Sequence, residues 1–118
     1  MKLIECPRDA MQGFSSLIPT QKKIKYLNQL LKVGFDTIDI GSFVSKKQIP
    51  QLADTAEVLN NINIYNSISK LLVIVGNKRG AIEASQFEQI SYIGFPFSIS
   101  ETFQKKNINA SIQDSLKT

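Results

Sequence analysis

The chain has 118 residues and a net charge of +4, with 42% apolar and 20% charged side chains, a composition that excludes a disordered tail. Its single cysteine, Cys6, cannot form an internal disulfide, and no apolar run reaches the roughly 18 residues of a membrane span. We therefore predict a cytoplasmic globular protein with no membrane partner.

The first strand–helix unit is expected within the first 34 residues. A short apolar strand over 2–5 ends before Pro7, and Cys6 beside it is expected to be a small buried residue. The segment 8–19 is long for a simple connection, so we expect a functional loop there. A helix follows from Thr20, whose hydroxyl is expected to cap it, to Gly34, a residue typical of helix ends.

Three similar units follow along the chain. They are a strand over 37–40, a loop over 41–47 and a helix over 50–60; a strand over 71–75, a loop over 76–80 and a helix over 81–87; and a strand over 90–97 before a helix over 111–117. Strand and helix thus alternate four times, which predicts the α/β class with a parallel sheet. A (β/α)₈ barrel needs about 250 residues, so the chain would make about half of one. A small open sheet of the flavodoxin-like kind is the alternative.

Polar side chains follow the predicted strands, where α/β proteins bind their ligands. Arg8, Asp9 and Gln12 follow the first strand, Ser42 the second and Asn77 the third. A carboxylate is a ligand that divalent cations prefer, and an arginine remains protonated and stabilises negative charge on an oxygen. An Arg-Asp pair is also common in turns and surface salt bridges, so the pair alone leaves both interpretations open.

Three segments carry a family resemblance that extends over nearly the whole chain. They are PRDAMQ (7–12), DIGSFVSKKQIPQLADTAEV (39–58) and FQKKNINASI (103–112). In this order they resemble the hydroxymethylglutaryl-CoA lyase family. The resemblance implies one partial catalytic domain over 1–118, the N-terminal half (about four β/α units) of a (β/α)₈ TIM barrel. The alternative is an acyl-CoA condensing synthase of the isopropylmalate or homocitrate synthase type, although those enzymes usually lack the SFVS block.

The resemblance also implies roles for individual residues. Asp9 would bind the metal, Mg²⁺ or Mn²⁺. Arg8 would be the catalytic residue that stabilises the enolate as 3-hydroxy-3-methylglutaryl-CoA is cleaved to acetyl-CoA and acetoacetate. The predicted substrate-binding residues are Gln12, Ser42, Asp39, Asn77, Asn107 and Asn109. For Asn107 and Asn109, turn formation is an equal alternative.

The chain departs from the family pattern at several positions. Asp39 is shorter than the usual glutamate, Gly41 replaces a hydroxyl residue, and Asn77 alone remains of a T-P-N motif. The chain has no histidine, whereas the family's metal site also uses an H-x-H pair. Because one aspartate cannot hold Mg²⁺ in a defined geometry, we predict that the chain by itself is inactive. A non-catalytic half-barrel that assembles with a partner chain is a further hypothesis.

The expected partner is a small acyl-CoA substrate, and the full-length protein is expected to be a homodimer. Nucleic acid is not predicted as a partner, although the chain is basic. The lysines between 22 and 32 lie on the helix with the apolar stripe, and the pairs at 46–47 and 105–106 lie in separate loops. No aromatic residues alternate with them to stack on bases, so a solvated helix face is expected.

Overall fold

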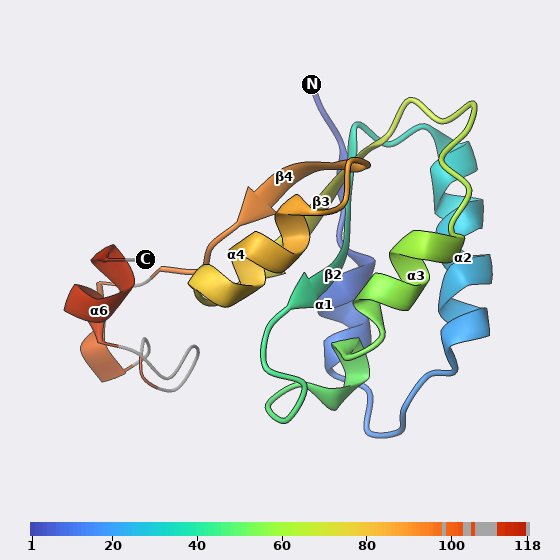
Figure 1. The fold of residues 1–118 in the computed structure, drawn as a ribbon. Helices are drawn as coiled ribbons and strands as arrows, with labels where there is room; N and C mark the ends of the chain where they lie inside the picture. Colours follow the sequence, from blue (N-terminus) through green and yellow to red (C-terminus); the bar gives the residue numbers. More distant parts are fainter. Residues whose placement is uncertain (98, 103–104, 106–110, 118) are drawn as a thin grey trace.

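The computed structural model describes residues 1–97, 99–102, 105 and 111–117 (Figure 1). Its elements are β1 (Ile4–Glu5), α1 (Pro7–Gln12), α2 (Thr20–Val33), β2 (Thr37–Phe43), the 3-10 turn η1 (Pro50–Leu52), α3 (Thr55–Asn61), β3 (Lys70–Val75), α4 (Lys78–Ser85), β4 (Ile90–Gly94) and α6 (Ile112–Leu116). The strands form one parallel sheet in the order β1-β2-β3-β4. The predicted α/β class and the alternation of strands and helices are therefore confirmed.

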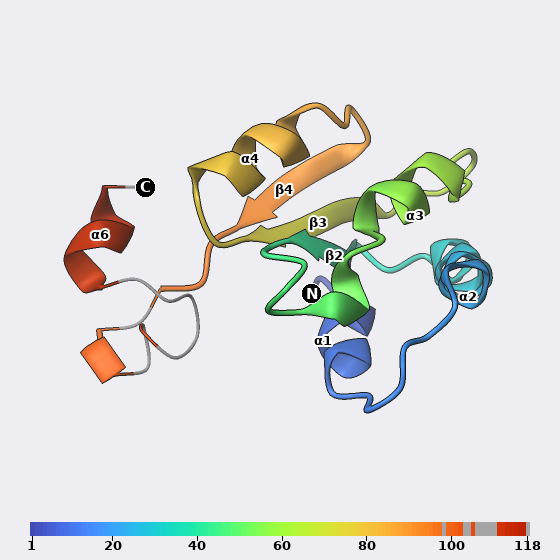
Figure 2. The same ribbon diagram turned by 60° about the horizontal axis from the view of Figure 1, so that its bottom comes forward.

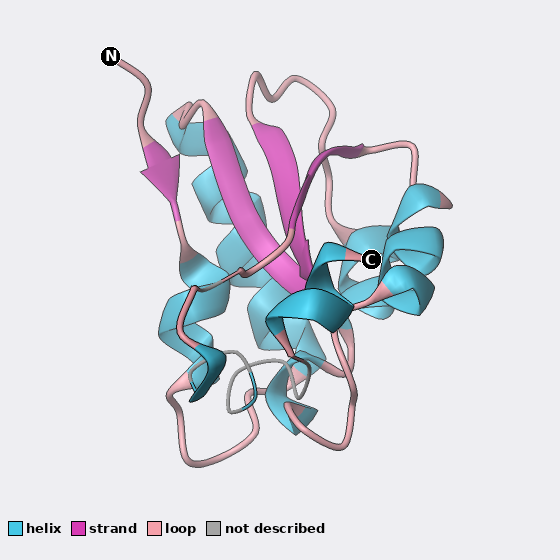
Figure 3. Ribbon diagram, turned by 90° about the vertical axis from the view of Figure 1, so that its left-hand side faces the viewer, coloured by secondary structure: helices cyan, strands magenta, loops and turns pink. Residues whose placement is uncertain are grey.

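The hydrophobic core lies between the sheet and the helices α2, α3 and α4, which Figure 2 shows on one side of the strands. Figure 3 shows the strands side by side. Ile38 in β2 and Val73 in β3 are fully buried, and Leu27 of α2 packs in the same cluster. Burying each such side chain contributes about 1.5–3 kcal/mol, so this layer is a major source of stability. The polar residues Arg8 and Ser42 lie outside it, near the ends of the strands.

The segment after the first strand is a helix rather than the predicted loop. Pro7 occupies the first turn of α1, where its missing N–H costs nothing, and Met11 is buried. The polar residues Arg8 and Asp9 therefore lie on a short helix that directly follows β1. Cys6 precedes this helix and is exposed, so the expectation that it is buried was wrong.

The two ends of α2 differ in how well they were predicted. Gly34 ends the helix with a φ of 96°, a left-handed conformation that favours glycine, as expected. Thr20 does not cap the helix, because Pro19 occupies the capping position and the Thr20 hydroxyl donates to Asp54 Oδ2 at 2.7 Å. A tertiary hydrogen bond has replaced the local one.

Other boundaries moved by a few residues. β2 continues to Phe43, so Ser42 lies in the strand and not in the loop after it. The predicted helix over 50–60 is divided into η1 and α3, α4 begins at Lys78, and β4 ends at Gly94. The segment that contains Asn107 and Asn109 lies outside the described residues. No helix in the described part of the chain is long and apolar enough to cross a membrane.

Candidate active site at the carboxyl ends of the strands

Arg8 is held in place by two side chains. Its Nε donates to both carboxylate oxygens of Asp39, at 3.1 and 2.9 Å, and its Nη1 donates to Gln12 Oε1 at 3.0 Å. The side chains of Arg8 and Asp39 are only 17% and 6% exposed, respectively. Nη2 has no hydrogen-bond partner among the described residues. The guanidinium is thus fixed on one side and keeps donors for a ligand on the other.

Asp39 connects the sheet to α1 through this ion pair. Burial raises the pKa of its carboxyl, and the positive charge of Arg8 opposes that rise. The carboxylate is one of the buried polar groups of β2 and does not line the nearest cavity. The structure therefore brings Asp39 to Arg8, as a group that orients the guanidinium.

Asp9 lies beside Arg8 and faces solvent. Its side chain is 75% exposed, and Oδ1 lies 3.8 Å from Arg8 Nη1. The described residues contain no cluster of three His, Cys, Asp or Glu side chains that could hold a metal ion. Because Mg²⁺ takes about six oxygen ligands, Asp9 suits the role of one ligand, but the described residues do not form a complete metal site.

A cavity of about 380 Å³ lies next to these groups. Its lining is Arg8, Asp9, Gln12, Ser42, Val44, Ile49, Ile74, Gly94, Phe95 and Pro96. The volume falls within the usual range of small-molecule sites, about 300–1,000 Å³. The sequence predicted the polar wall, formed by α1 and β2. It did not predict the apolar wall, because only the parallel pairing of β2, β3 and β4 brings those side chains to the same edge.

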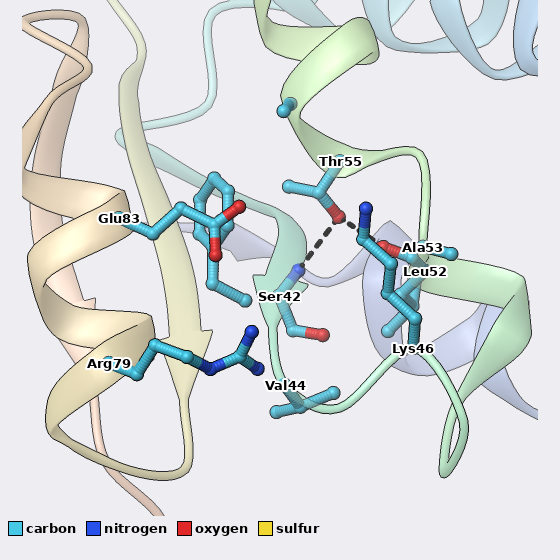
Figure 4. A pocket seen from close by; sticks show the side chains of 10 residues that line it. Ser42, Val44, Lys46, Leu52, Ala53, Thr55, Arg79 and Glu83 are labelled. Carbon is cyan, nitrogen blue, oxygen red and sulfur yellow. Dashed lines mark hydrogen bonds between the residues drawn. The ribbon is translucent and has the colours of Figure 1, made fainter.

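Ser42 contributes a buried hydroxyl to this edge. The residue is 4% exposed, and its Oγ has no hydrogen-bond partner among the described residues. Its backbone N–H donates to Thr55 Oγ1 at 3.2 Å (Figure 4). Gly41 makes room for this contact, since a Cβ there would lie 2.7 Å from Thr55 Oγ1. An unpaired buried hydroxyl costs about 1–3 kcal/mol, so Ser42 is suited to bonding a ligand.

The remaining predicted residues lie elsewhere. Asn77 caps α4, where its Oδ1 accepts a hydrogen bond from the Gly80 N–H at 2.9 Å, and it does not line the 380 Å³ cavity. Asn107 and Asn109 are outside the described residues, so their predicted substrate contacts and the alternative of turn formation both stay predictions.

A group of hydrogen bonds between the segment that precedes α2 and the segment around η1 was not predicted. Gln51 Oε1 accepts from the Ile18 N–H at 2.8 Å, and its Nε2 donates to the Ser16 carbonyl at 2.9 Å. The buried Lys23 forms an ion pair with Asp54 at 2.8 Å and donates to the Gln51 carbonyl. These bonds join the segment between α1 and α2, and Lys23 of α2, to η1 and Asp54.

Comparison with known proteins shows which proteins the chain resembles. No model of a protein family matches the chain. The chain is 40% identical to the cytoplasmic 3-hydroxy-3-methylglutaryl-CoA lyase of Rattus norvegicus, over 98% of its own length and 34% of the relative. It is 39% identical to the mitochondrial hydroxymethylglutaryl-CoA lyase of Gallus gallus, over 99% of its own length and 39% of the relative. The chain is therefore similar to hydroxymethylglutaryl-CoA lyases over nearly its whole length.

Solved structures of hydroxymethylglutaryl-CoA lyases agree in fold. One from Acinetobacter baumannii, in complex with coenzyme A and 3-methylmalate, matches with a TM-score of 0.92 at 33% identity, covering 99% of this chain and 38% of that one. One from Bacillus subtilis matches with a TM-score of 0.88 at 36% identity, covering 98% and 39%. The resemblance to this family and the partial match to its barrel structures are thus confirmed, and the chain spans about a third of the length of its relatives.

Proposed function

We propose that this chain forms the arginine-bearing part of a divalent-metal-dependent lyase that cleaves 3-hydroxy-3-methylglutaryl-CoA to acetyl-CoA and acetoacetate. The observation that carries the proposal is the geometry of Arg8, which is oriented by Asp39 and Gln12 on the wall of a 380 Å³ cavity. The relative solved with coenzyme A and a hydroxy dicarboxylic acid supports an acyl-CoA ligand.

Arg8 would stabilise the charge that develops during cleavage. As the carbon–carbon bond breaks, its electron pair moves toward the thioester carbonyl of the acetyl fragment and forms an enolate. Positive charge fixed near that oxygen lowers the barrier, and removing one such donor typically reduces kcat by about 10²–10³. The Nη2 hydrogens suit this role, because no described residue accepts them.

The other predicted residues take different places in this proposal. Gln12 and Ser42 line the cavity and would contact the substrate. Asp39 would act as a positioning residue through Arg8, in place of the direct substrate contact predicted from the family. Asn77 remains a proposed substrate contact, although its side-chain oxygen caps α4.

Asp9 is proposed as one ligand of the divalent cation, Mg²⁺ or Mn²⁺. The family implies such a cation, but the described residues offer too few ligands to hold it. Further oxygen or nitrogen ligands must therefore come from groups other than the described residues. We also keep the predictions of a cytoplasmic location and a homodimeric full-length protein, while the relatives include cytoplasmic and mitochondrial enzymes.

A chimeric enzyme tests this function. Residues 1–118 replace the matching part of the Bacillus subtilis relative, and cleavage of 3-hydroxy-3-methylglutaryl-CoA is measured with Mg²⁺ or Mn²⁺. We expect activity that falls by about 10²–10³ in Arg8→Met and hardly changes in Lys22→Met, which removes an exposed charge from α2. The isolated chain should be inactive. A folded chimera that condenses acetyl-CoA with a 2-oxo acid, and does not cleave, would support the synthase alternative.

A further inference from the structure

Two basic residues that are far apart in the sequence line the same cavity at the carboxyl edge of the sheet. β2 and β3 are parallel neighbours, so the segments that follow them lie next to each other. Lys46, after β2, and Arg79, in the first turn of α4, line one cavity of about 30 Å³. Ser42 lies at the same cavity, and Figure 4 shows the guanidinium of Arg79 pointing toward it.

Three polar side chains of this small cavity, those of Ser42, Lys46 and Arg79, lack partners among the described residues. Ser42 Oγ is buried and accepts or donates no hydrogen bond within the described part of the chain. Lys46 and Arg79 form no ion pair with any described residue. One carboxylate, that of Glu83, also lines the cavity. Two cationic side chains and one carboxylate thus line the cavity, so the formal charge of its lining is positive.

The backbone adds to this positive potential. α4 has eight residues, and its first turn, Lys78 to Gly80, begins beside the cavity. A helix N-terminus carries a partial positive charge and favours anions. Asn77 already accepts from the Gly80 N–H, so a ligand would be bound mainly by side chains.

We propose that Lys46, Arg79 and Ser42 form a subsite for a phosphate group. Guanidinium and ammonium groups are the usual hydrogen-bond donors to phosphate oxygens, and the Ser42 hydroxyl is a third donor. A volume of about 30 Å³ holds about two water molecules, which is enough space for one or two phosphate oxygens. Because Ser42 also lines the cavity beside Arg8, the subsite adjoins the proposed reaction site.

The phosphate can come from free phosphate or from the coenzyme A part of a substrate, and only the second source depends on the proposed function. Calorimetric titration of the chain with inorganic phosphate, pyrophosphate, coenzyme A and pantetheine distinguishes them. If Arg79→Gln weakens the binding of coenzyme A but not that of pantetheine, the phosphate is the one carried by coenzyme A. Arg79-dependent binding of phosphate with no competition by coenzyme A identifies the free anion and still supports the subsite.

Arg79→Gln and Lys46→Gln are the test variants, and Lys47→Gln is the matched control, since it removes the same charge from the same loop without lining the cavity. Each test variant should weaken phosphate or pyrophosphate binding by about fivefold to tenfold at low salt, and the control by less than about twofold. Equal losses in all the variants, or no binding of any phosphate compound at millimolar concentration, would overturn the proposal.

Two further measurements keep the result interpretable. Circular dichroism and thermal unfolding establish that each variant folds, and the same titrations are repeated on the chimera. Binding is measured without turnover, so it can succeed when the chimera shows no lyase activity. A single-stranded oligonucleotide that binds and loses affinity equally in the three variants would show a diffuse basic surface and would overturn the subsite.

Discussion

The Arg8–Asp39 pair predicts a loss of stability whose size depends on which partner is removed. Arg8→Met leaves the Asp39 carboxylate 6% exposed, with no other described donor. Breaking a buried pair in this way costs about 3–5 kcal/mol. Asp39→Asn leaves an arginine that is 17% exposed at a cavity and still bonds Gln12. That loss should be smaller, about 1–2 kcal/mol.

The pH dependence separates an electrostatic cause from a packing cause. Burial raises the pKa of Asp39, and in Arg8→Met the opposing positive charge is gone, so the pKa rises further. A group with a raised folded-state pKa stabilises the fold when protonated and loses that stabilisation as the pH rises through the folded-state pKa. The destabilisation by Arg8→Met should therefore be largest near neutral pH and shrink as the pH falls.

Urea unfolding followed by circular dichroism at pH 7.5, 6 and 5 measures this series, with Lys22→Met as the control for charge removal from an exposed site. Lys22→Met should change the free energy of unfolding by less than about 0.5 kcal/mol. A loss in Arg8→Met that is the same at all three pH values would refute the reasoning, because it would show that Asp39 does not titrate in the folded variant.

Three other predictions concern the surroundings of the site. Gly41→Ala should lower the free energy of unfolding by about 1–3 kcal/mol, because its new methyl group would contact Thr55. In a double-mutant cycle measured by urea unfolding, this loss should be at least about 0.5 kcal/mol smaller in the Thr55→Ala background. Strictly additive losses would contradict the close approach of Gly41 and Thr55. Gln51→Ala should speed hydrogen exchange of the Ile18 amide by roughly fivefold, and unchanged exchange would show that this bond does not hold the segment. Desolvation raises the pKa of the Cys6 thiol, so iodoacetamide should modify it more slowly than free cysteine at pH 7.5, and an equal rate would contradict this.

The sequence was sufficient to predict four strands alternating with helices, because that alternation depends on local apolar patterns, but it did not predict the short helix α1. It was insufficient where a distant residue decides the structure. Thr20 is a good capping residue, yet its hydroxyl donates a hydrogen bond to Asp54 instead. Asp39 pairs with Arg8, 31 residues earlier, and no periodicity of the sequence encodes this pairing. Ser42 was expected in a loop because the sequence does not show the register that extends β2 along β3.

The candidate site was predicted in its parts rather than in its arrangement. Arg8, Asp9, Gln12 and Ser42 were named from their positions after strands, and the structure places them around one cavity. Lys46 was assigned to a loop of its own, and no role was predicted for Arg79, 33 residues later in the sequence. The parallel pairing of β2 and β3 brings both residues to one cavity, so their proximity to it depends on topology.

The same ion pair serves the proposed chemistry and the fold, and this affects how activity measurements are interpreted. Asp39 fixes the direction of the Arg8 guanidinium, while Arg8 compensates the charge that β2 buries. A variant of either residue will therefore lose rate and stability together. Arg8→Lys separates the two effects, because it keeps a positive charge for Asp39 but lacks the planar fork that donates to Asp39 and a ligand at once. If Arg8→Lys retains most of the stability lost in Arg8→Met and the chimera still loses activity about as strongly, the loss arises from the missing guanidinium donors. If activity returns together with stability, Arg8 acts mainly by holding the sheet to α1.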